Sequence, residues 1–330
     1  MARATAVDRV LRDERAPDEI ATALLEAFLV CLDADGGCVH LTDPASGVPI
    51  GGSSLGETAG SFEQSIDFEY RRPDALRFRD LAHRSGRTAA LGIETGGELH
   101  RSARYVEMIE PSGGGDELRV SFGDSFGTWA TLVAFRRRPF ATADVEFVAG
   151  TVDGVSASLR RGWAAGTGSV ETDAAPVVLV LDAADRLVST DAVGKERFAD
   201  LGGTPGTLPQ PFFVVAAEAR EGRAGRAIAR GSSGAWHTIE ASRLDDEPYG
   251  AVAVVVRPAS AQSLADLIFR AFGLSARERE VARYALEGRS AKAIAGELVL
   301  SPYTVEDHLK RIYDKTGARS REGLAQLART

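Results

Sequence analysis

The chain has 330 residues, of which 44% are hydrophobic and 26% charged, and its formal net charge is −8. This length suffices for two or three domains with cores of their own, while the net acidity, taken alone, argues against nucleic acid as a partner. No apolar run approaches the roughly 18 residues of a membrane span, and the charged first residues lack a signal-peptide core. We therefore expect a cytoplasmic protein with no membrane partner.

The cysteine content excludes a disulfide scaffold, because the chain has only Cys31 and Cys38. A single C-x6-C pair also lacks the further ligands that a zinc site needs. We therefore predict two buried thiols and no metal.

The first region reads as a mixture of helices and strands. Apolar residues at helical spacing predict a helix over residues 20–32. The Gly36-Gly37 pair then predicts a break, followed by a strand over 38–42 and a turn over 43–47. The remaining predicted elements are helical stretches between Pro73 and Pro111, a loop over 112–115, and strands over 118–122 and 129–135.

A long amphipathic helix is predicted to close this region, because its apolar residues alternate at spacings of three and four. Such a seam suits packing against the sheet or against a second copy of the same helix. Packing in the core is the favoured alternative. The seam consists of Val145, Val148, Val152, Val155 and Leu159.

This order of elements resembles a GAF domain, in which a helix precedes a central antiparallel sheet. The last strand, Trp129-Ala130-Thr131-Leu132-Val133, and the Pro139-Phe140-Ala141 entry to the terminal helix carry the resemblance, which covers about residues 15–160. It implies a domain that senses small molecules, binds a chromophore or haem, or mediates dimers. His40, His83 and His100 are interpreted as surface or packed histidines, so no cofactor ligand is assigned.

Residues 162–176 lack periodicity and are rich in Gly, Ala, Thr and Ser, which predicts a linker. The unit that follows is similar to a PAS domain, with a strand-turn-strand start, short helices and a terminal hairpin. The resemblance implies ligand binding or signal transmission, and a compact α+β connector without a pocket is the alternative. The predicted strands are 177–181, 187–190, 236–244 and 251–257, with helices near 192–201 and 212–221.

The C-terminal region shows the start and stop signals of several short helices. Ser275, with Glu278 three residues later, predicts a capping box at the start of a helix over 277–286, which Gly288 ends. Ser290 is a second N-cap candidate, for a helix that ends near Val299.

A third helix is predicted to start at Ser301 as N-cap, with Pro302 at the first helical position. Its apolar residues recur at spacings of four, three and four, which places them on one stripe. Gly317 suits the position after its last turn, and Ser320 suggests a fourth helix over 320–328. The stripe consists of Val305, Leu309, Ile312 and Thr316, and the opposite polar face includes Tyr303, Asp307, Lys310, Arg311 and Asp314.

These residues resemble the LuxR-type (FixJ or NarL type) four-helix DNA-binding domain. The motifs that carry the resemblance are Leu274-Ser275-x-x-Glu278-x-Glu280, Ile294-Ala295, Ser301-x-x-Thr304-Val305-x-x-His308, Lys315-x-Gly317 and Arg319-Ser320-Arg321. They lie within roughly the last 60 residues. The resemblance implies that the third helix enters the major groove of double-stranded DNA and that the fourth helix mediates a homodimer.

The resemblance also implies which residues approach DNA. Two acidic residues, Glu306 and Asp307, depart from the common family pattern at this place. Either could accept a hydrogen bond from a cytosine amino group, or both could lie in solvent or pair locally, as Glu306 could with Lys310. The candidate DNA-binding residues are Lys292, Tyr303, Thr304, Glu306, Asp307, His308, Lys310, Arg311 and Arg319.

The charge of the chain is unevenly distributed. Residues 262–330 carry 12 Lys and Arg against 9 Asp and Glu, whereas residues 1–261 carry 27 against 38. A weakly basic module on an acidic body can bind DNA locally while the body limits nonspecific binding.

We find no sequence motif of an enzyme: the chain lacks a P-loop, a G-x-S-x-G elbow and an H-E-x-x-H pair. We predict no catalytic residue and no cofactor. The acidic residues Asp182 and Asp185 are also not set in the pattern of a phosphoreceiver domain.

Together these patterns predict a multidomain α+β protein in which GAF-like and PAS-like sensor domains precede an all-α helix-turn-helix domain. The expected function is a one-component transcription regulator that binds DNA as a homodimer, with an unidentified small-molecule effector and a contact to RNA polymerase. The alternative is a sensor whose C-terminal helices dock on a protein partner without binding DNA. The predicted boundaries are 1–161 (GAF-like), 162–176 (linker), 177–258 (PAS-like) and 262–330 (helix-turn-helix).

Overall fold

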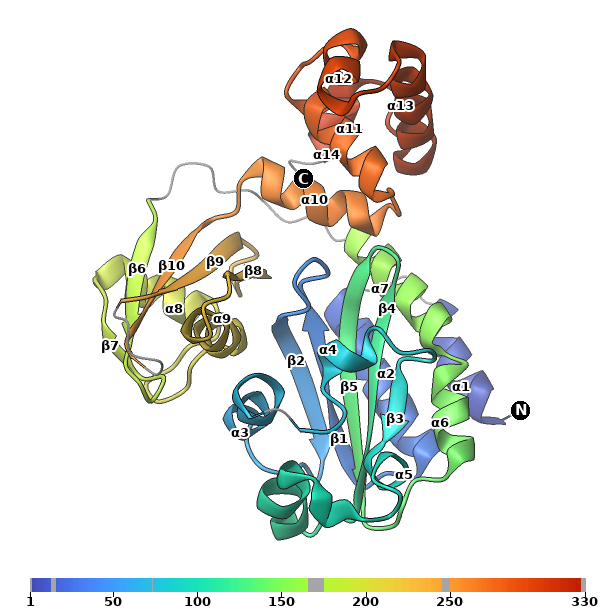
Figure 1. Cartoon of the computed structure of the whole chain (residues 1–330), viewed down its shortest axis with the longest axis vertical. Helices are drawn as coiled ribbons and strands as arrows, with labels where there is room; N and C mark the ends of the chain where they lie inside the picture. Colours follow the sequence, from blue (N-terminus) through green and yellow to red (C-terminus); the bar gives the residue numbers. More distant parts are fainter. Residues whose placement is uncertain (1, 13–15, 73, 166–174, 245–249, 328–330) are drawn as a thin grey trace.

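The computed structural model of the chain describes residues 2–12, 16–72, 74–165, 175–244 and 250–327. Two five-stranded sheets lie side by side, and a group of helices stands at one end of the molecule (Figure 1). This arrangement confirms a multidomain α+β fold with an all-α C-terminal part. We call the described residues 2–165 the first unit, 175–258 the second unit and 261–327 the C-terminal helices.

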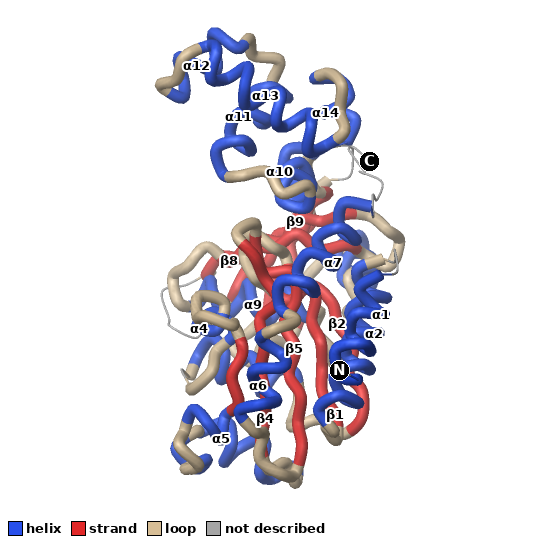
Figure 2. The backbone as a smooth tube through the Cα atoms, turned by 90° about the vertical axis from the view of Figure 1, so that its right-hand side faces the viewer, coloured by secondary structure: helices blue, strands red, loops and turns tan. Residues whose placement is uncertain are grey.

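The first unit is built on a sheet that has helices on one face and short segments on the other (Figure 2). All its strand pairs are antiparallel, in the order β2-β1-β5-β4-β3. The strands are β1 (Gly36–Thr42), β2 (Pro49–Gly56), β3 (Thr88–Ala90), β4 (Asp116–Asp124) and β5 (Gly127–Arg136); the helices on the first face are α1 (Ala2–Arg12), α2 (Pro17–Leu32), α6 (Thr142–Ala149) and α7 (Val152–Ala165).

The opposite face of this sheet carries a layer of short helical segments. They cover a second apolar cluster that includes Phe68, Leu81 and Met108. Because successive residues of a strand point to opposite faces, Leu118 and Val120 of β4 belong to the core under the long helices, whereas Arg119 points to the other face. The segments are α3 (Phe62–Ile66), η1 (Asp67–Arg71), α4 (Phe78–Leu81), α5 (Leu91–Glu94), η2 (Leu99–Arg101), η3 (Tyr105–Ile109) and η4 (Glu110–Ser112).

The predicted break at Gly36-Gly37 is wrong, because β1 begins at Gly36. A Cβ on Gly37 would lie 2.3 Å from the backbone oxygen of Val133 on β5. The glycine therefore permits close approach of two strands, which a sequence pattern cannot distinguish from a turn. The strands β2 and β3 were not predicted, since β2 lacks apolar alternation and β3 has only three residues.

The predicted long closing helix is two helices, because α6 ends at Ala149 and α7 begins at Val152. Its seam packs in the core, as favoured: Val148, Val155 and Leu159 are fully buried. The prediction of a linker from residue 162 is also wrong, because α7 continues to Ala165. Residues 166–174 of that predicted linker lie outside the described residues.

The second unit repeats the strand order of the first, as β7-β6-β10-β9-β8, again with antiparallel pairs throughout. The four predicted strands and two predicted helices are confirmed, and β8 is an addition. The elements are β6 (Val177–Leu181), β7 (Leu187–Ser189), α8 (Ala192–Asp200), α9 (Gln210–Arg220), β8 (Gly225–Arg230), β9 (Trp236–Arg243) and β10 (Val252–Pro258).

Helix α9 lies between the second sheet and the first unit. Phe213 on α9 contacts Phe62 of the first unit edge-to-face, with ring centroids 6.0 Å apart. A second aromatic contact joins Trp163 of α7 to Trp236 of β9, with centroids 5.6 Å apart. The two units therefore share apolar interfaces at two places.

An ion-pair bridge also joins the two units. The carboxylate of Asp185, in the turn between β6 and β7, accepts from Arg71 of the first unit and from Arg220 of α9. Asp185 adopts φ of +58°, a conformation that is uncommon for a residue other than glycine. This bridge fixes the β6–β7 turn against the first unit.

The C-terminal part contains the four predicted helices and one further helix, α10, that the sequence analysis did not identify. Helix α10 connects the second unit to the others and packs against both α7 and α11 (Figures 1 and 2). The bounds are α10 (Ala261–Ala271), α11 (Ala276–Leu286), α12 (Ala291–Leu298), α13 (Pro302–Thr316) and α14 (Arg321–Leu327).

Candidate nucleic-acid interface and the cavity of the first unit

The predicted caps of the C-terminal helices are confirmed. Ser275 and Glu278 form a capping box at the start of α11, in which each side chain accepts a hydrogen bond from the other residue's backbone N–H. Ser290 and Ser301 cap α12 and α13 with their hydroxyl oxygens alone, which accept from the backbone N–H groups of Ala293 and Thr304. These caps satisfy backbone N–H groups that the helices leave unpaired, so the chain's local chemistry defines where each helix begins.

A tight turn separates α12 from α13. Val299 ends α12 with φ of +54° and is 91% exposed. A β-branched residue in this conformation is a genuine outlier. Pro302 then starts α13 directly after the Ser301 cap, so the two helices follow each other as helix, turn, helix.

Helix α13 has one buried stripe and one solvent-facing side, as predicted. All four residues of the stripe are at most 7% exposed, and Val305, Leu309 and Ile312 join the hydrophobic core formed with α11, α12 and α14. This stripe holds α13 rigidly, so its polar side is presented at a fixed orientation.

The structure brings most of the candidate residues onto one helix. Lys292 is exposed at the start of α12, and Arg319 is exposed between α13 and α14. Thr304, Asp307 and His308 are half-buried on α13. The candidates that are exposed on α13 are Tyr303, Glu306, Lys310 and Arg311.

The local pair between Glu306 and Lys310, one of the alternatives left open by the sequence, does not form among the described residues. Instead, Arg311 pairs with Asp307 one turn earlier, with 2.8 Å between Nη2 and Oδ2. Of the two adjacent acidic residues, Glu306 therefore has no cation partner in the described part of the chain. Lys310 likewise has no carboxylate partner there.

Two candidates have contacts inside the domain. The hydroxyl of Thr304 lies 2.8 Å from that of Ser301, next to the cap. Nδ1 of His308 is buried and has no hydrogen-bond partner among the described residues. His308 therefore packs at the edge of the buried stripe rather than projecting with the polar side.

An ion pair that sequence reasoning did not assign joins the two ends of the domain. Nζ of Lys315 lies 2.6 Å from Oε2 of Glu278 and also donates to the backbone oxygen of Gly273. Burial alone would raise the pKa of Glu278, but the hydrogen bonds from Lys315 and Ser275 outweigh it and hold the pKa below its usual value. The pair ties the end of α13 to the start of α11.

Helix α10 attaches these helices to the first unit. Nη1 of Arg270 donates to the backbone oxygen of Phe126, in the β4–β5 hairpin, over 2.7 Å. Nη1 of Arg160 on α7 donates to the backbone oxygen of Ala271 over 3.2 Å. The C-terminal helices are therefore hydrogen-bonded to both α7 and the β4–β5 hairpin.

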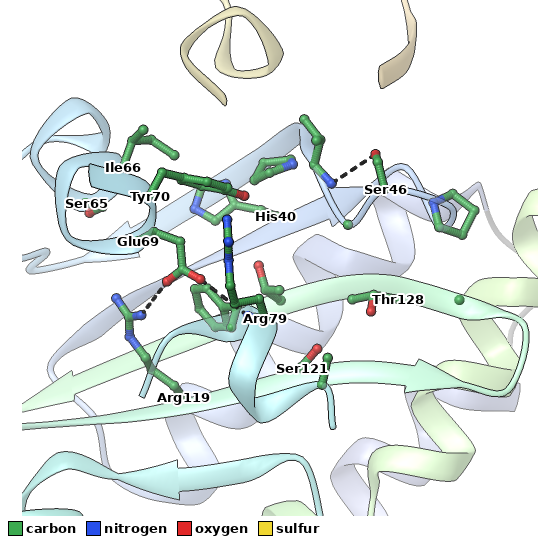
Figure 3. A pocket seen from close by; sticks show the side chains of 18 of the residues that line it. His40, Ser46, Ser65, Ile66, Glu69, Tyr70, Arg79, Arg119, Ser121 and Thr128 are labelled. Atoms are coloured by element: carbon green, nitrogen blue, oxygen red, sulfur yellow. Dashed lines mark hydrogen bonds and ion pairs between the residues drawn. The ribbon is translucent and has the colours of Figure 1, made fainter. Parts of the chain in front are cut away.

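A cavity of about 600 Å³ lies on the face of the first sheet opposite the long helices. Figure 3 shows it between the strands that carry Arg119, Ser121 and Thr128 and the segment that carries Ile66 and Tyr70. The second unit and α10 also contribute to its wall, with Glu218, Arg223, Ala224, Arg226 and Arg270. The cavity therefore touches all three parts of the molecule.

Ionizable groups at the floor of this cavity are held by one another. Arg119 donates to Glu69 over 3.1 Å and also pairs with Glu117. Burial raises the pKa of Glu69, although Arg119 opposes this. Burial also lowers the pKa of His40 to about 4, and Nδ1 of His40 lies 3.3 Å from Oε1 of Gln210 on α9.

The histidines and cysteines differ in part from expectation. His40 and His83 line the cavity, whereas His100 is exposed and contacts Glu110. Cys31 is buried as predicted, but Cys38 is half-buried and also lines the cavity. The place of His40 and Cys38 on the cavity wall depends on the register of β1, which the sequence pattern did not reveal.

The described part of the chain offers neither a cluster of metal ligands nor a helix suited to span a membrane. Among the described residues, no three His, Cys, Asp or Glu side chains come together as metal ligands. None of the helices in those ranges is both long and apolar enough to cross a bilayer.

Sequence comparison places the last part of the chain in a family. Residues 273–328 match the sequence model of the bacterial regulatory proteins of the luxR family. The probable transcriptional regulatory protein NarL from two strains of Mycobacterium tuberculosis is 50% identical over 48 residues, which cover 14% of this chain and 22% of the relative. The chain thus spans about a fifth of the length of these curated relatives.

Solved structures give weaker matches over longer stretches. A complex of VqmA from Vibrio cholerae with ligand and DNA is 22% identical and covers 47% of this chain and 81% of that chain, with a TM-score of 0.22. SdiA from Escherichia coli is 12% identical and covers 99% of this chain and 94% of that chain, with a TM-score of 0.34. Scores this low do not establish a common overall architecture.

Proposed function

The C-terminal helices are a helix-turn-helix domain of the luxR family of bacterial regulatory proteins, and from this we propose that the chain is a transcription regulator that binds double-stranded DNA through α13. The observation that carries the proposal is that three basic side chains are exposed and unpaired within the described residues. Lys292, Lys310 and Arg319 are exposed, and none has a carboxylate partner among the described residues. Unpaired cations on a rigid surface are available for phosphate contacts.

The polar side of α13 supplies the groups that would read bases. An α-helix fits the major groove, where each base pair presents a distinct pattern of donors and acceptors. Glu306 is exposed and has no cation partner within the described ranges, so its carboxylate is free to accept from a cytosine amino group. Asp307 is engaged by Arg311, which makes Glu306 the better candidate for a C·G contact.

The pairing of two copies is part of the proposal. Helix α14, whose Leu324 is buried in the domain core, would provide the contact between two C-terminal domains. A homodimer of this kind binds two half-sites about one helical turn of DNA apart. The expected site is therefore a two-fold repeat.

We propose that the first and second units sense a small molecule in the 600 Å³ cavity. A cavity of this size suits a small organic ligand. The β4–β5 hairpin lines it through Asp124 and Phe126, and Phe126 accepts a hydrogen bond from Arg270 of α10. A ligand that displaces this hairpin would therefore move α10, which shares the core of the DNA-binding domain.

The test is selection from fragmented genomic DNA with the purified full-length protein, followed by footprinting on the enriched fragment. The proposal predicts an enriched two-fold repeat, protected on one face of the duplex. The variant K310A together with R319A should lose the footprint. If the wild type enriches no motif and instead retains a protein partner through α11–α14, the domain docks on protein and the proposal is wrong.

A further inference from the structure

We propose that the cavity of the first unit binds a small organic acid, held through its carboxylate by Arg87 and Ser121. This inference rests on the proposed sensing role and names the chemical class of the ligand. It is carried by two polar groups on the cavity wall that have no partner among the described residues.

The first of these groups is the guanidinium of Arg87. Among the described residues, six arginines and three carboxylates line the cavity. Arg79, Arg119, Arg223, Arg226 and Arg270 each pair with a carboxylate. Arg87 alone among the lining arginines has neither a carboxylate nor a side-chain hydrogen bond within the described ranges, although it is half-buried. The cavity therefore carries one uncompensated positive charge inside an acidic body.

The second group is the hydroxyl of Ser121 on β4. Ser121 is fully buried, and its Oγ has no hydrogen-bond partner in the described part of the chain. A buried hydroxyl without a partner costs free energy. Because Ser121 lies on the cavity side of the sheet (Figure 3), a ligand atom in the cavity can supply the missing partner.

The two groups are neighbours in the sheet. The backbone N–H of Ser121 donates to the backbone oxygen of Arg87 over 2.9 Å. Arg87 adopts φ of +50°, a conformation that costs a non-glycine residue free energy and that structures retain at functional positions. A Cβ on Gly123 would lie 2.6 Å from Nη1 of Arg87, so the glycine leaves room for the guanidinium on the same strand as Ser121.

The charge and the shape of the cavity select the class of ligand. One free guanidinium and one hydroxyl match the two oxygens of a carboxylate, which arginine binds through parallel N–H groups. A phosphate dianion would need a second free cation. The wall also carries apolar and aromatic side chains, including Phe62, Ile66, Phe78, Met108, Val133 and Phe135. The occupant is therefore a monocarboxylate with an apolar or aromatic body.

The test measures binding to the full-length protein in the absence of DNA. The probes are benzoate, phenylacetate, 3-phenylpropionate and octanoate, each compared with its primary amide by calorimetry and by the shift in melting temperature. We expect at least one acid to bind about tenfold or more tightly than its amide. If no acid binds, or if acids and amides bind equally, the proposal is overturned.

Variants locate the site. R87Q should bring the affinity of the best acid to within about threefold of its amide while changing the melting temperature of the free protein little, because the guanidinium has no carboxylate or hydrogen-bond partner among the described residues. S121A should weaken the acid several-fold, and S121F should exclude acid and amide alike by filling the cavity. R101Q is the matched control, since Arg101 is exposed on the same unit and outside the cavity. An acid preference that survives R87Q would place the ligand elsewhere.

The outcome is separable from that of the proposed function. Retention of the genomic fragment by the wild type, measured alongside, reports on α13 and not on the cavity. Acid binding without DNA retention would support the ligand class and contradict DNA binding. DNA retention without acid binding would support the transcription regulator and contradict the ligand class.

Discussion

Leu267 and Phe269, two residues apart on α10, are buried in different hydrophobic cores. Leu267 is 7% exposed and packs with α2, α7 and the first sheet, whereas Phe269 is fully buried with Val281, Val305 and Ile312 of the DNA-binding domain. A helix with apolar residues on two sides is held by both of the bodies it contacts. Helix α10 is therefore the physical connection through which a change in the first unit can reach α13.

Replacing Phe269 by Ala should unfold the DNA-binding domain at lower temperature while the first unit stays folded. Loss of a buried Phe costs about 3–5 kcal/mol, and loss of Leu267 about 2–5 kcal/mol. All three tryptophans lie outside residues 262–330, so tryptophan fluorescence follows the first two units and circular dichroism follows all helices. F269A should lower the midpoint temperature of unfolding measured by circular dichroism alone. L267A should lower the midpoint temperature measured by tryptophan fluorescence. Identical effects of both variants would mean that the two faces of α10 do not stabilise different domains.

The Lys315–Glu278 pair should stabilise the domain in a pH-dependent manner. Because the pKa of Glu278 is held below its usual value, its contribution is present at neutral pH and is lost as pH falls through that lowered pKa. K315M should destabilise the domain by about 1–3 kcal/mol and move the acid loss of stability to higher pH. The matched control is E280Q, which breaks the more exposed Arg277–Glu280 pair and should change stability by less than about 1 kcal/mol. Equal effects of the two variants would contradict this role.

Protonation of His40 should weaken the first unit at acidic pH. Its folded-state pKa is lowered to about 4 by burial, whereas a histidine in the unfolded chain has its ordinary pKa of about 6.5. Stability should therefore be constant above neutral pH and fall as pH drops from about 6.5 to about 4, by less than about 3 kcal/mol. H40Q should flatten this part of the tryptophan-detected stability profile. A profile that is the same with and without His40 would show that the imidazole is solvated.

Glu306 should determine base preference at one position. E306Q should leave phosphate contacts intact but lose about 1–3 kcal/mol of discrimination at a single C·G pair of the selected site. The measurement is competition among sites that carry each base at every position. D314N, at the exposed C-terminal end of α13, is the control and should not change preference. An unaltered base preference in E306Q would show that Glu306 contacts no base and that its side chain lies in solvent.

Strong local signals made the C-terminal domain predictable from sequence. Ser275, Ser290 and Ser301 each cap a helix through a hydroxyl a few residues from the groups it binds, so the information lies within one turn of chain. The buried stripe of α13 follows from helical spacing in the same way. The ion pair on α13 was left open, because i, i+4 spacing allows both Glu306 with Lys310 and Asp307 with Arg311, and side-chain geometry selected the second.

The parts that were missed depend on contacts distant in sequence. Strand β2 is recognisable only through its pairing with β1, where Gly52 accommodates the backbone of Val39. Trp163 appeared to be linker because its partner, Trp236, lies more than seventy residues away. The cavity is formed from three parts of the chain, so no local pattern identifies Arg87 or Ser121 as its polar groups.

The most direct test of DNA binding by α13 is the affinity of the full-length protein for its selected site across a salt series. The account predicts that log affinity falls linearly with log salt concentration and that K310A weakens binding on all sequences and reduces the slope by about one. An affinity that is independent of salt, or a K310A variant with the wild-type slope, would contradict the placement of α13 on the DNA backbone.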